Sequence, residues 1–243
     1  MQNPICFFDS GIGGATILRE VIKVLPNENY IYYADSINNP YGNKSKDELF
    51  KIVDNIVNKL LVYNPKLIIC ACNTATSMVL NDIRKKYPDI TFVGTEPAIK
   101  VVHDYYKNEK SIVITTRGTG ESERFKELFK TYKTIDCKLI EAPDLAELIE
   151  NNNDTYDYLK KILKNNLDAE VVVLGCTHFP LAIKNLKRIL PNATFIDGSK
   201  GISKRVKVLL NNNLNDKKGS IKVISSKNDV TDKVLSIIKD LTF

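Results

Sequence analysis

Long apolar runs are missing from this sequence: no stretch approaches the roughly 20 apolar residues that a membrane-spanning helix needs. The first ten residues, MQNPICFFDS, also lack the basic region followed by an apolar stretch that is typical of a secretory signal. We therefore expect a cytoplasmic protein without a membrane partner. At 243 residues, 43% of them hydrophobic, the chain has enough material for one large domain or two small ones.

Cysteine and histidine are scarce. The five cysteines form an odd number, and with no secretory signal they argue against a disulfide framework. Only His103 and His178 are available to join them as metal ligands, and the cysteine spacing is poor for zinc. We therefore expect no metal site. A thiol redox protein that uses Cys70 and Cys72 is an alternative, and it would need the two sulfur atoms close together.

Dense clusters of positive charge are absent too. The net charge is +6, but the lysines are scattered beside acidic residues on the predicted helices. Proteins that bind nucleic acid gather their basic residues in a stripe, interleaved with aromatic side chains. We therefore expect no nucleic-acid partner, and at most a mild preference for anionic ligands.

Short β-branched runs, in contrast, alternate with amphipathic segments almost throughout. The clearest helix is predicted over residues 45–63, where Ser45 and Glu48 form a capping box ahead of one apolar face. Another is predicted over 73–87. This alternation predicts a parallel α/β fold, with the active site beyond the carboxyl ends of the strands. Strands are expected over residues 5–8, 30–34, 67–71, 90–94, 111–115, 136–140, 170–175, 194–197 and 220–225.

A weak internal repeat divides the chain into two parts. Three pairs of similar segments follow one another in order at nearly constant spacing, which suggests two similar α/β halves. We predict two parallel-sheet domains that face each other across a cleft, the first over residues 1–97 plus about 210–243 and the second over 98–209. The pairs and their separations are Cys72 and Cys176 (104 residues), Ser10 and Thr116 (106), and Asp35 and Asp144 (109).

Two of the cysteines lie where chemistry is expected. Cys72 and Cys176 each follow a predicted strand and precede a predicted helix, and a helix N-terminus lowers the pKa of a thiol by stabilising the thiolate. His178 is two residues from Cys176 and could move a proton there, while Asp9 ends the first strand and could play the matching role for Cys72. The alternatives are inert buried thiols, a packing histidine and an aspartate that caps a turn.

Glycine is rare as well, yet three of the 11 glycines, Gly11, Gly13 and Gly14, directly follow Asp9 and Ser10. Glycine is placed where the backbone turns sharply or approaches something closely. The segment joins a predicted strand to a predicted helix, where backbone N–H groups can face an anion. Either a ligand site or a plain tight turn is consistent with this pattern.

Five motifs together carry a resemblance. DSGIGG, PYGNKS, CNTATS, GTEPAIK and GCTHFPL resemble the motif set of bacterial glutamate racemases, in the same order and at suitable spacing. The resemblance implies a two-domain α/β fold and a cofactor-independent interconversion of L- and D-glutamate, which supplies D-glutamate for peptidoglycan. It also implies a homodimer.

The same resemblance implies roles for particular residues. Cys72 and Cys176 match the two acid/base thiols, Asp9 and His178 the groups that support them, and Glu150 a glutamate near the second half of the site. The positions implied to bind substrate are Asp9, Ser10, Pro40, Tyr41, Gly42, Asn73, Thr74, Thr116, Thr119, Thr177 and His178.

Some segments depart from the family pattern. Many members have Cys-Pro where this chain has Ala142-Pro143, and the segment that follows, with Glu147, is more acidic than usual. Many also have Asp-Ser where this chain has Asp197-Gly198. An aspartate racemase of the same superfamily, and a non-catalytic protein that closes two lobes on an amino acid, are the alternative functions.

Overall fold

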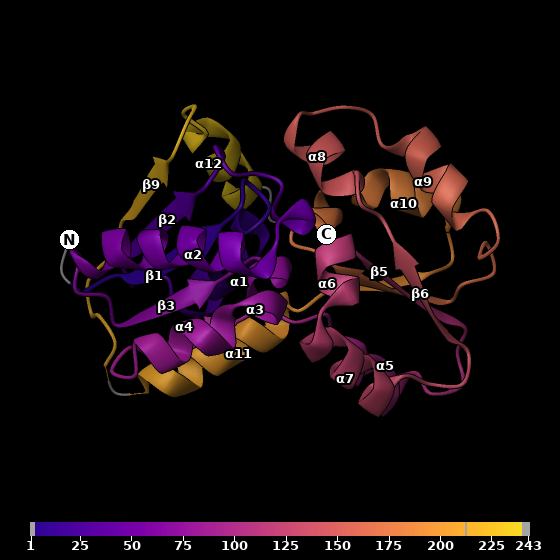
Figure 1. Cartoon of the computed structure of the whole chain (residues 1–243), viewed down its shortest axis with the longest axis horizontal. Helices are drawn as coiled ribbons and strands as arrows, with labels where there is room; N and C mark the ends of the chain where they lie inside the picture. Colours follow the sequence, from indigo (N-terminus) through magenta and orange to yellow (C-terminus); the bar gives the residue numbers. More distant parts are fainter. Residues whose placement is uncertain (1–2, 212, 240–243) are drawn as a thin grey trace.

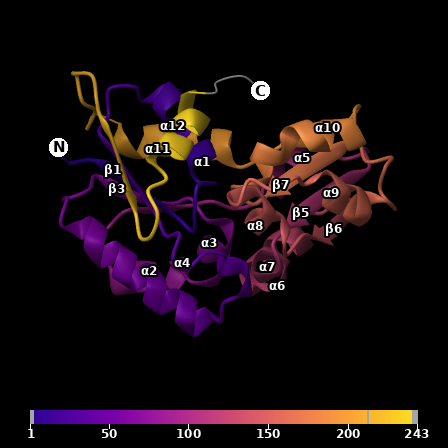
Figure 2. The same ribbon diagram turned by 90° about the horizontal axis from the view of Figure 1, so that it is seen from above.

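Two lobes lie side by side in the computed structural model, which describes residues 3–211 and 213–239. Each lobe is built on one parallel β-sheet covered by helices, and the two views of the ribbon separate the lobes in the same way (Figures 1 and 2). The prediction of a two-lobed parallel α/β fold is confirmed. Within the described residues, every helix is too short or too polar to cross a bilayer.

The two sheets repeat one strand order. The first sheet reads β4 (Phe92–Gly94), β3 (Leu67–Cys70), β1 (Ile5–Asp9), β2 (Tyr30–Ala34) and β9 (Ile221–Ser225). The second reads β8 (Thr194–Ile196), β7 (Val171–Gly175), β5 (Ser111–Thr115) and β6 (Cys137–Glu141). All neighbours pair in parallel, so β1, β2, β3 and β4 correspond in turn to β5, β6, β7 and β8. All nine predicted strands are present, and β9 is an addition to the first sheet only.

Helices connect the strands. In chain order they are α1 (Ala15–Val24), η1 (Tyr41–Asn43), α2 (Lys46–Leu61), α3 (Asn73–Met78), α4 (Leu80–Lys86), α5 (Ile99–Tyr105), α6 (Arg117–Glu121), α7 (Glu123–Tyr132), α8 (Leu145–Glu150), α9 (Tyr156–Leu163), η2 (Phe179–Ala182), α10 (Ile183–Ile189), α11 (Ser199–Leu210) and α12 (Thr231–Lys239). The Ser45 side chain caps α2 as predicted, accepting the Glu48 N–H at 3.2 Å. The single helix predicted over 73–87 is two helices, because Val79 leaves helical geometry at φ −131°.

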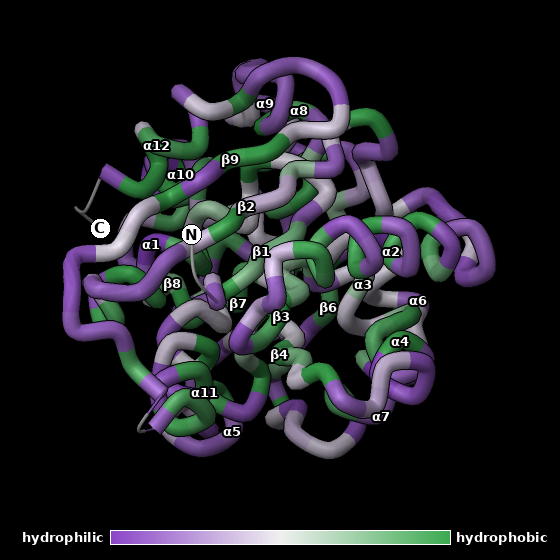
Figure 3. Tube along the Cα trace, turned by 90° about the vertical axis from the view of Figure 1, so that its left-hand side faces the viewer, coloured by the Kyte–Doolittle hydropathy of each residue, from purple (hydrophilic) through white to green (hydrophobic). Residues whose placement is uncertain are grey.

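Alternate residues of each strand face opposite layers of helices. In β1, Ile5 and Phe7 pack toward α1, α11 and α12, whereas Cys6 and Phe8 pack toward α2, α3 and α4. The second sheet is covered by α8, α9 and α10 on one face and by α5 and α7 on the other. Figure 3 shows the hydrophobic colouring along the central strands and the hydrophilic colouring on the connections. The strands β1, β2, β3, β5 and β7 are therefore buried on both faces, which explains their continuous apolar runs, whereas the edge strands β6, β8 and β9 are partly exposed.

The chain returns to the first lobe earlier than the predicted position near residue 210. Helix α11 already packs on α1, and its buried residues Ile202, Val206 and Leu210 belong to the core of the first sheet. The orange α11 and yellow α12 lie against the first lobe in both ribbon views. An amphipathic helix has the same apolar pattern whichever sheet it covers. The sequence therefore did not show that the chain returns to the first lobe before α11. Of the predicted range 210–243, residues 212 and 240–243 lie outside the described residues.

Candidate functional site

The carboxyl ends of four strands meet where the two lobes touch. Asp9 ends β1, Cys72 lies two residues beyond β3, Thr116 follows β5 and Cys176 follows β7. In the first sheet the chain leaves β1 and β3 toward opposite edges of the sheet. In the second sheet it leaves β5 and β7 in the same way. That is the position at which open parallel sheets bind their ligands.

Asp9 is fully buried and is held by the turn that follows it. Its Oδ2 accepts the N–H groups of Gly11 and Gly14, each at 3.2 Å, and its Oδ1 accepts the hydroxyl of Thr177 at 3.3 Å from the other lobe. Burial raises the pKa of Asp9, although the charge of His178 and the two N–H groups oppose this effect. The carboxylate is thus a polar link between the lobes, and not simply a turn cap.

The glycines of this turn make room for the second lobe. A Cβ on Gly11 would lie 2.2 Å from Oε2 of Glu150, and one on Gly13 would lie 2.4 Å from Nδ1 of His178. None of the described glycines has a positive φ, so backbone conformation alone does not require glycine here. Of the two roles considered for these glycines, the structure supports close approach to the second lobe.

Cys176, His178 and Glu150 form a chain of polar contacts. The Sγ of Cys176 lies 3.9 Å from Nδ1 of His178, whose Nε2 lies 2.7 Å from Oε2 of Glu150. The same Glu150 oxygen accepts the N–H of Ile12, in the first lobe, at 2.9 Å. Burial disfavours the imidazolium, but contacts with Cys176 and Glu150 outweigh burial and raise the pKa of His178 well above its usual value. Burial opposes ionisation of Glu150 as well, yet His178 lowers the pKa of this carboxyl.

Cys72 has a different environment. It is the N-cap of α3 and is buried within the junction. Burial, with the nearby carboxylate of Asp9, raises the pKa of the Cys72 thiol well above its usual range, and Cys176 is near enough to add to the effect. The expectation that a helix N-terminus lowers the pKa is therefore wrong for Cys72, because burial outweighs a single turn of N–H groups. Cys176 does not begin a helix: His178 is the N-cap of the 3-10 helix η2.

Three threonines join the lobes on another side of the junction. The hydroxyl of Thr74, on α3, lies 3.0 Å from that of Thr116 and 3.3 Å from that of Thr119. Thr116 caps α6 and lies 3.1 Å from Thr119. All three are buried. They form a cluster of donors and acceptors without formal charge, of the kind that can hold a carboxylate.

The remaining predicted positions surround this cluster. Buried Asn73 donates from Nδ2 to the carbonyl of Thr95 at 3.2 Å. The hydroxyl of Tyr41 donates to Oδ2 of Asp35 at 2.7 Å, and a Cβ on Gly42 would lie 3.3 Å from the Cβ of Thr116. The structure thus brings the η1 segment against α6, which the sequence motifs alone did not establish.

Two further predicted positions lie on the first lobe. Ser10 is buried directly behind Asp9. Pro40 is partly buried and follows Asn39 through a cis peptide bond, immediately before η1. Ser10 and Pro40 are thus chain neighbours of Asp9 and of η1, both of which contact the second lobe.

Two residues were missed by the sequence analysis. The hydroxyl of Tyr32 donates to the carbonyl of Gly11 at 2.7 Å, and that of Thr16 lies 3.2 Å from the carbonyl of Thr177. Tyr32 gives no signal, since aromatic residues are common in strands. Thr16 gives little signal either, because the buried face of α1 also carries the polar Arg19.

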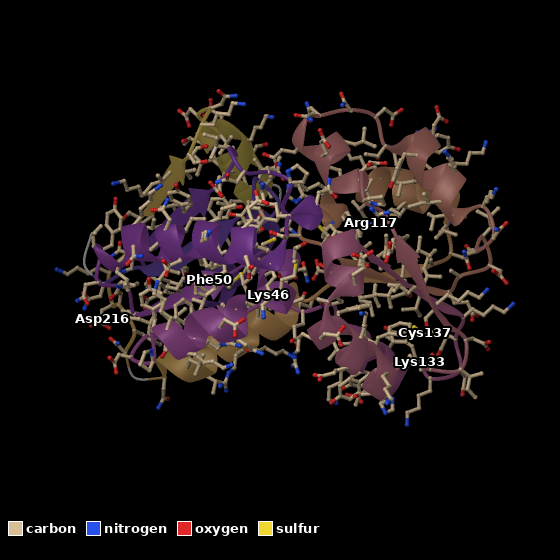
Figure 4. All side chains as sticks on the ribbon, in the orientation of Figure 1. Lys46, Phe50, Arg117, Lys133, Cys137 and Asp216 are labelled. Carbon is tan, nitrogen blue, oxygen red and sulfur yellow. The ribbon has the colours of Figure 1, made fainter. Side chains whose placement is uncertain are left out.

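The other three cysteines match the alternative of inert, buried thiols. Burial raises the pKa of Cys6 and of Cys70 to about 12, so both stay protonated. Cys137 lies on β6, on the far side of the second lobe from the junction (Figure 4). All five thiols are free. Within residues 3–211 and 213–239, no three histidine, cysteine or acidic side chains gather as a metal site would require.

Known proteins are similar to this chain over nearly its whole length. The family model of Asp/Glu/hydantoin racemases matches residues 28–201. The glutamate racemase of Clostridium novyi is 41% identical, covering 98% of this chain and 96% of the relative. The glutamate racemase of Clostridium acetobutylicum is 39% identical, covering 97% and 96%.

Solved structures agree with these matches. The Escherichia coli glutamate racemase, in complex with L-glutamate and the activator UDP-MurNAc-Ala, superposes with a TM-score of 0.84 at 31% identity, covering 99% of this chain and 96% of that one. The Francisella tularensis glutamate racemase, in complex with D-glutamate, gives 0.80 at 26%, covering 98% and 92%. An aspartate racemase from Picrophilus torridus shares the fold, with a TM-score of 0.57 at 13% identity, covering 87% and 94%.

Proposed function

Because the chain belongs to the Asp/Glu/hydantoin racemase family, and within it to the glutamate racemases, we propose that it interconverts L- and D-glutamate with Cys72 and Cys176 as opposing acid and base. One observation supports this assignment above the others. The two thiols follow corresponding strands, β3 and β7, of two sheets with the same strand order, and they are near enough for their charges to interact.

Racemisation needs a proton removed from one face of Cα and another delivered to the opposite face. Two groups on opposite sides of the substrate meet this need directly, and each must act as acid in one direction and as base in the other. In the resting enzyme one is a thiolate and the other a thiol. Two negative charges facing each other across the site oppose each other, so only one of the two thiols is ionised at a time.

The neighbours of the two thiols indicate which of them carries the charge at rest. The imidazolium of His178 is beside Cys176, whereas the carboxylate of Asp9 acts on Cys72. We assign the resting negative charge to the Cys176 side, where a cation offsets it. His178 then supports proton transfer at Cys176, and Asp9 supports it at Cys72.

The carbanion formed at Cα needs electrostatic help. We propose that the substrate carboxylates take hydrogen bonds from Asn73, Thr177 and the three clustered threonines, in place of some that these groups make with one another across the junction. Oriented donors in a water-excluded site stabilise developing charge without reorganising. Neither a cofactor nor a metal is part of this proposal, since the proton transfers need only side chains of this chain.

Heavy water tests the mechanism at short reaction times. Starting from L-glutamate with ordinary hydrogen at Cα, the delivering thiol has exchanged with solvent, so D-glutamate should carry deuterium from the start. The remaining L-glutamate should stay nearly unlabelled early on. Early D-glutamate that keeps much of its original Cα hydrogen would rule out two opposing thiols.

Serine variants complete this test. Cys72→Ser and Cys176→Ser should each reduce racemisation by orders of magnitude, because a hydroxyl is far less acidic than a thiol. Cys70→Ser is the control, since the Cys70 thiol is buried and protonated. Equal damage from Cys70→Ser, without loss of stability, would contradict the assignment.

The alternatives predict other results. An aspartate racemase would act on aspartate in a parallel chiral assay, and a binding protein would label neither enantiomer of glutamate.

We further propose that the product D-glutamate serves peptidoglycan synthesis in the cytoplasm and that the enzyme is a homodimer. The family resemblance supports these points, and light scattering of the purified protein tests the dimer.

A further inference from the structure

The turn from Cys176 to His178 is attached to both lobes. Two of its three carbonyl groups are bonded within the second lobe: that of Cys176 accepts the Phe179 N–H at 3.1 Å, and that of His178 accepts the Leu181 N–H at 2.9 Å. The middle carbonyl, of Thr177, has its partner in the first lobe, where Oγ1 of Thr16 lies 3.2 Å away. The position of this turn therefore depends on Thr16 of α1.

The hydroxyl of Thr16 has two possible acceptors. Its Oγ1 lies 2.8 Å from the carbonyl of Gly13 and 3.2 Å from that of Thr177, but a hydroxyl has one proton to donate. The Gly13 carbonyl already accepts the backbone N–H of Thr16 at 3.0 Å. Since a carbonyl oxygen has two lone pairs, the Gly13 carbonyl can accept the hydroxyl as well, so both acceptors are within reach of the one proton when the lobes are together and Gly13 keeps it when they are apart.

We propose that Thr16 is a positioning residue for the racemisation proposed above, whose hydroxyl moves between Gly13 and Thr177 as the lobes part and close, and fixes the turn that carries Cys176 and His178. The inference rests on the proposed function for its catalytic consequence. In both states the hydroxyl keeps an acceptor, so opening the site leaves no buried donor unpaired.

Thr177 shows why this bond matters for the reaction. Its backbone carbonyl faces Thr16 and its hydroxyl donates to Asp9, so the residue is held to the first lobe at two points. Its chain neighbours are Cys176 and His178. Since an error of about 1 Å in the position of a reacting group can cost roughly 100-fold in rate, losing one of two attachments should be visible in turnover.

Two substitutions at Thr16 distinguish the effect of its hydroxyl from the effect of its side-chain volume. Thr16→Val keeps the branched shape and removes the proton, and we expect kcat to fall about tenfold or more while KM stays within about threefold. Thr16→Ser keeps the hydroxyl and should retain kcat within about threefold of the unmodified enzyme. Because the equilibrium constant of a racemisation is one, kcat/KM must fall equally in both directions.

The matched control is Ser203. It is a buried helix residue whose hydroxyl donates to the carbonyl three positions earlier, that of Lys200, at 3.0 Å, all within α11. Ser203→Ala removes the same kind of bond without touching the junction and should leave kcat unchanged. If Ser203→Ala lowers kcat as much as Thr16→Val, the effect belongs to helix stability and the inference fails.

A second readout does not depend on turnover. Hydrogen exchange of the Phe179 and Leu181 amides should be faster in Thr16→Val than in Thr16→Ser, because the turn loses its attachment to the first lobe. Unchanged exchange together with unchanged kcat would overturn the inference. If the unmodified protein does not racemise glutamate, the proposed function fails, and the exchange rates still decide whether Thr16 holds the turn.

Discussion

At the scale of single residues, the junction places charges of opposite sign in contact inside the protein. The His178 and Glu150 pair joins an imidazole that is 1% exposed to a carboxylate whose side chain is 13% exposed. Each partner shifts the pKa of the other toward its charged form, upward for His178 and downward for Glu150. The pair therefore contributes to stability in a definite range of pH.

The variant Glu150→Gln tests this contribution, because the amide keeps an oxygen for the Ile12 N–H but loses the charge. Because the pKa of His178 is raised, the histidine's contribution to stability is fully present below its ordinary pKa of 6.5. This contribution is lost as the pH rises through the pKa of the folded state. Because the pKa of Glu150 is lowered, its contribution to stability is fully present above its ordinary pKa of 4.5. This contribution is lost as the pH falls through the pKa of the folded state.

We therefore expect the free energy of unfolding to differ most between pH 4.5 and 6.5, by about 2 kcal/mol in favour of the unmodified protein. The difference should shrink at more alkaline pH. Urea unfolding across this range measures it. A difference that does not change with pH would mean that charge is not what the pair contributes.

The sequence predicted which candidate side chains lie together better than it predicted their protonation states. Five motifs located Cys72, Cys176, Asp9 and His178, because side chains at strand ends are brought together by any parallel sheet. The raised pKa of Cys72 was not predictable, since it comes from burial against a second lobe whose contacts are far away in sequence. Thr16 was missed for the same reason: its partner, Thr177, is 161 positions away.

At the scale of elements, local patterns predicted the strands and the longest helix because alternation and capping act within a few residues. They could not assign α11 to a sheet. The strand that follows it, β9, pairs with β2, and the chain between α11 and β9 lies against a buried ion pair of the first lobe. Lys66 donates to Glu28 at 2.9 Å, and the two side chains are 4% and 1% exposed.

The same two side chains also hold the chain between α11 and β9. Lys66 donates to the carbonyl of Asn213 and to the Asn215 side chain, and Glu28 accepts the N–H of Asn215 at 2.8 Å. A Glu28 carboxylate left without Lys66 would keep the Asn215 N–H but would be buried without a counter-charge. The pair therefore helps to hold the segment between α11 and β9 against the loop before β2.

Lys66→Met should lower the free energy of unfolding by about 3 kcal/mol, because it leaves the Glu28 carboxylate buried without its cation. Chemical denaturation measures the change. Lys46→Met is the control, because the pair of Lys46 with Asp82 is on the surface, with side chains 59% and 36% exposed. We expect less than about 1 kcal/mol there. Equal effects would show that burial of the Lys66 pair does not matter.

At the scale of the whole molecule, two like lobes form one site only when they touch. The groups that chemistry requires come from both lobes: Asp9, Cys72 and Thr74 from the first, and Thr116 and Cys176 from the second. Each lobe buries its own core, so folding of the lobes and closure of the site are separable properties. A change confined to the contact surface should therefore affect activity more than stability.

Gly13→Ala is such a change. The added methyl would lie 2.4 Å from Nδ1 of His178, a buried ring that also bonds to Glu150, so the ring cannot yield without breaking that bond. We expect racemisation to fall by about 100-fold, because the second lobe is held away from Cys72 and Asp9. Each core remains intact, so the free energy of unfolding should fall only by the value of the lost polar contacts between the lobes, about 2 kcal/mol.

Gly201→Ala is the matched control, because a Cβ at Gly201 meets nothing within 4 Å. On α11 it should raise stability slightly, since alanine is the better helix former by about 1 kcal/mol, and leave racemisation unchanged. The two variants together separate closure from folding. If Gly13→Ala keeps full activity, the lobes do not need the contact seen between this glycine and His178, and the reaction proceeds in a more open arrangement of the same residues.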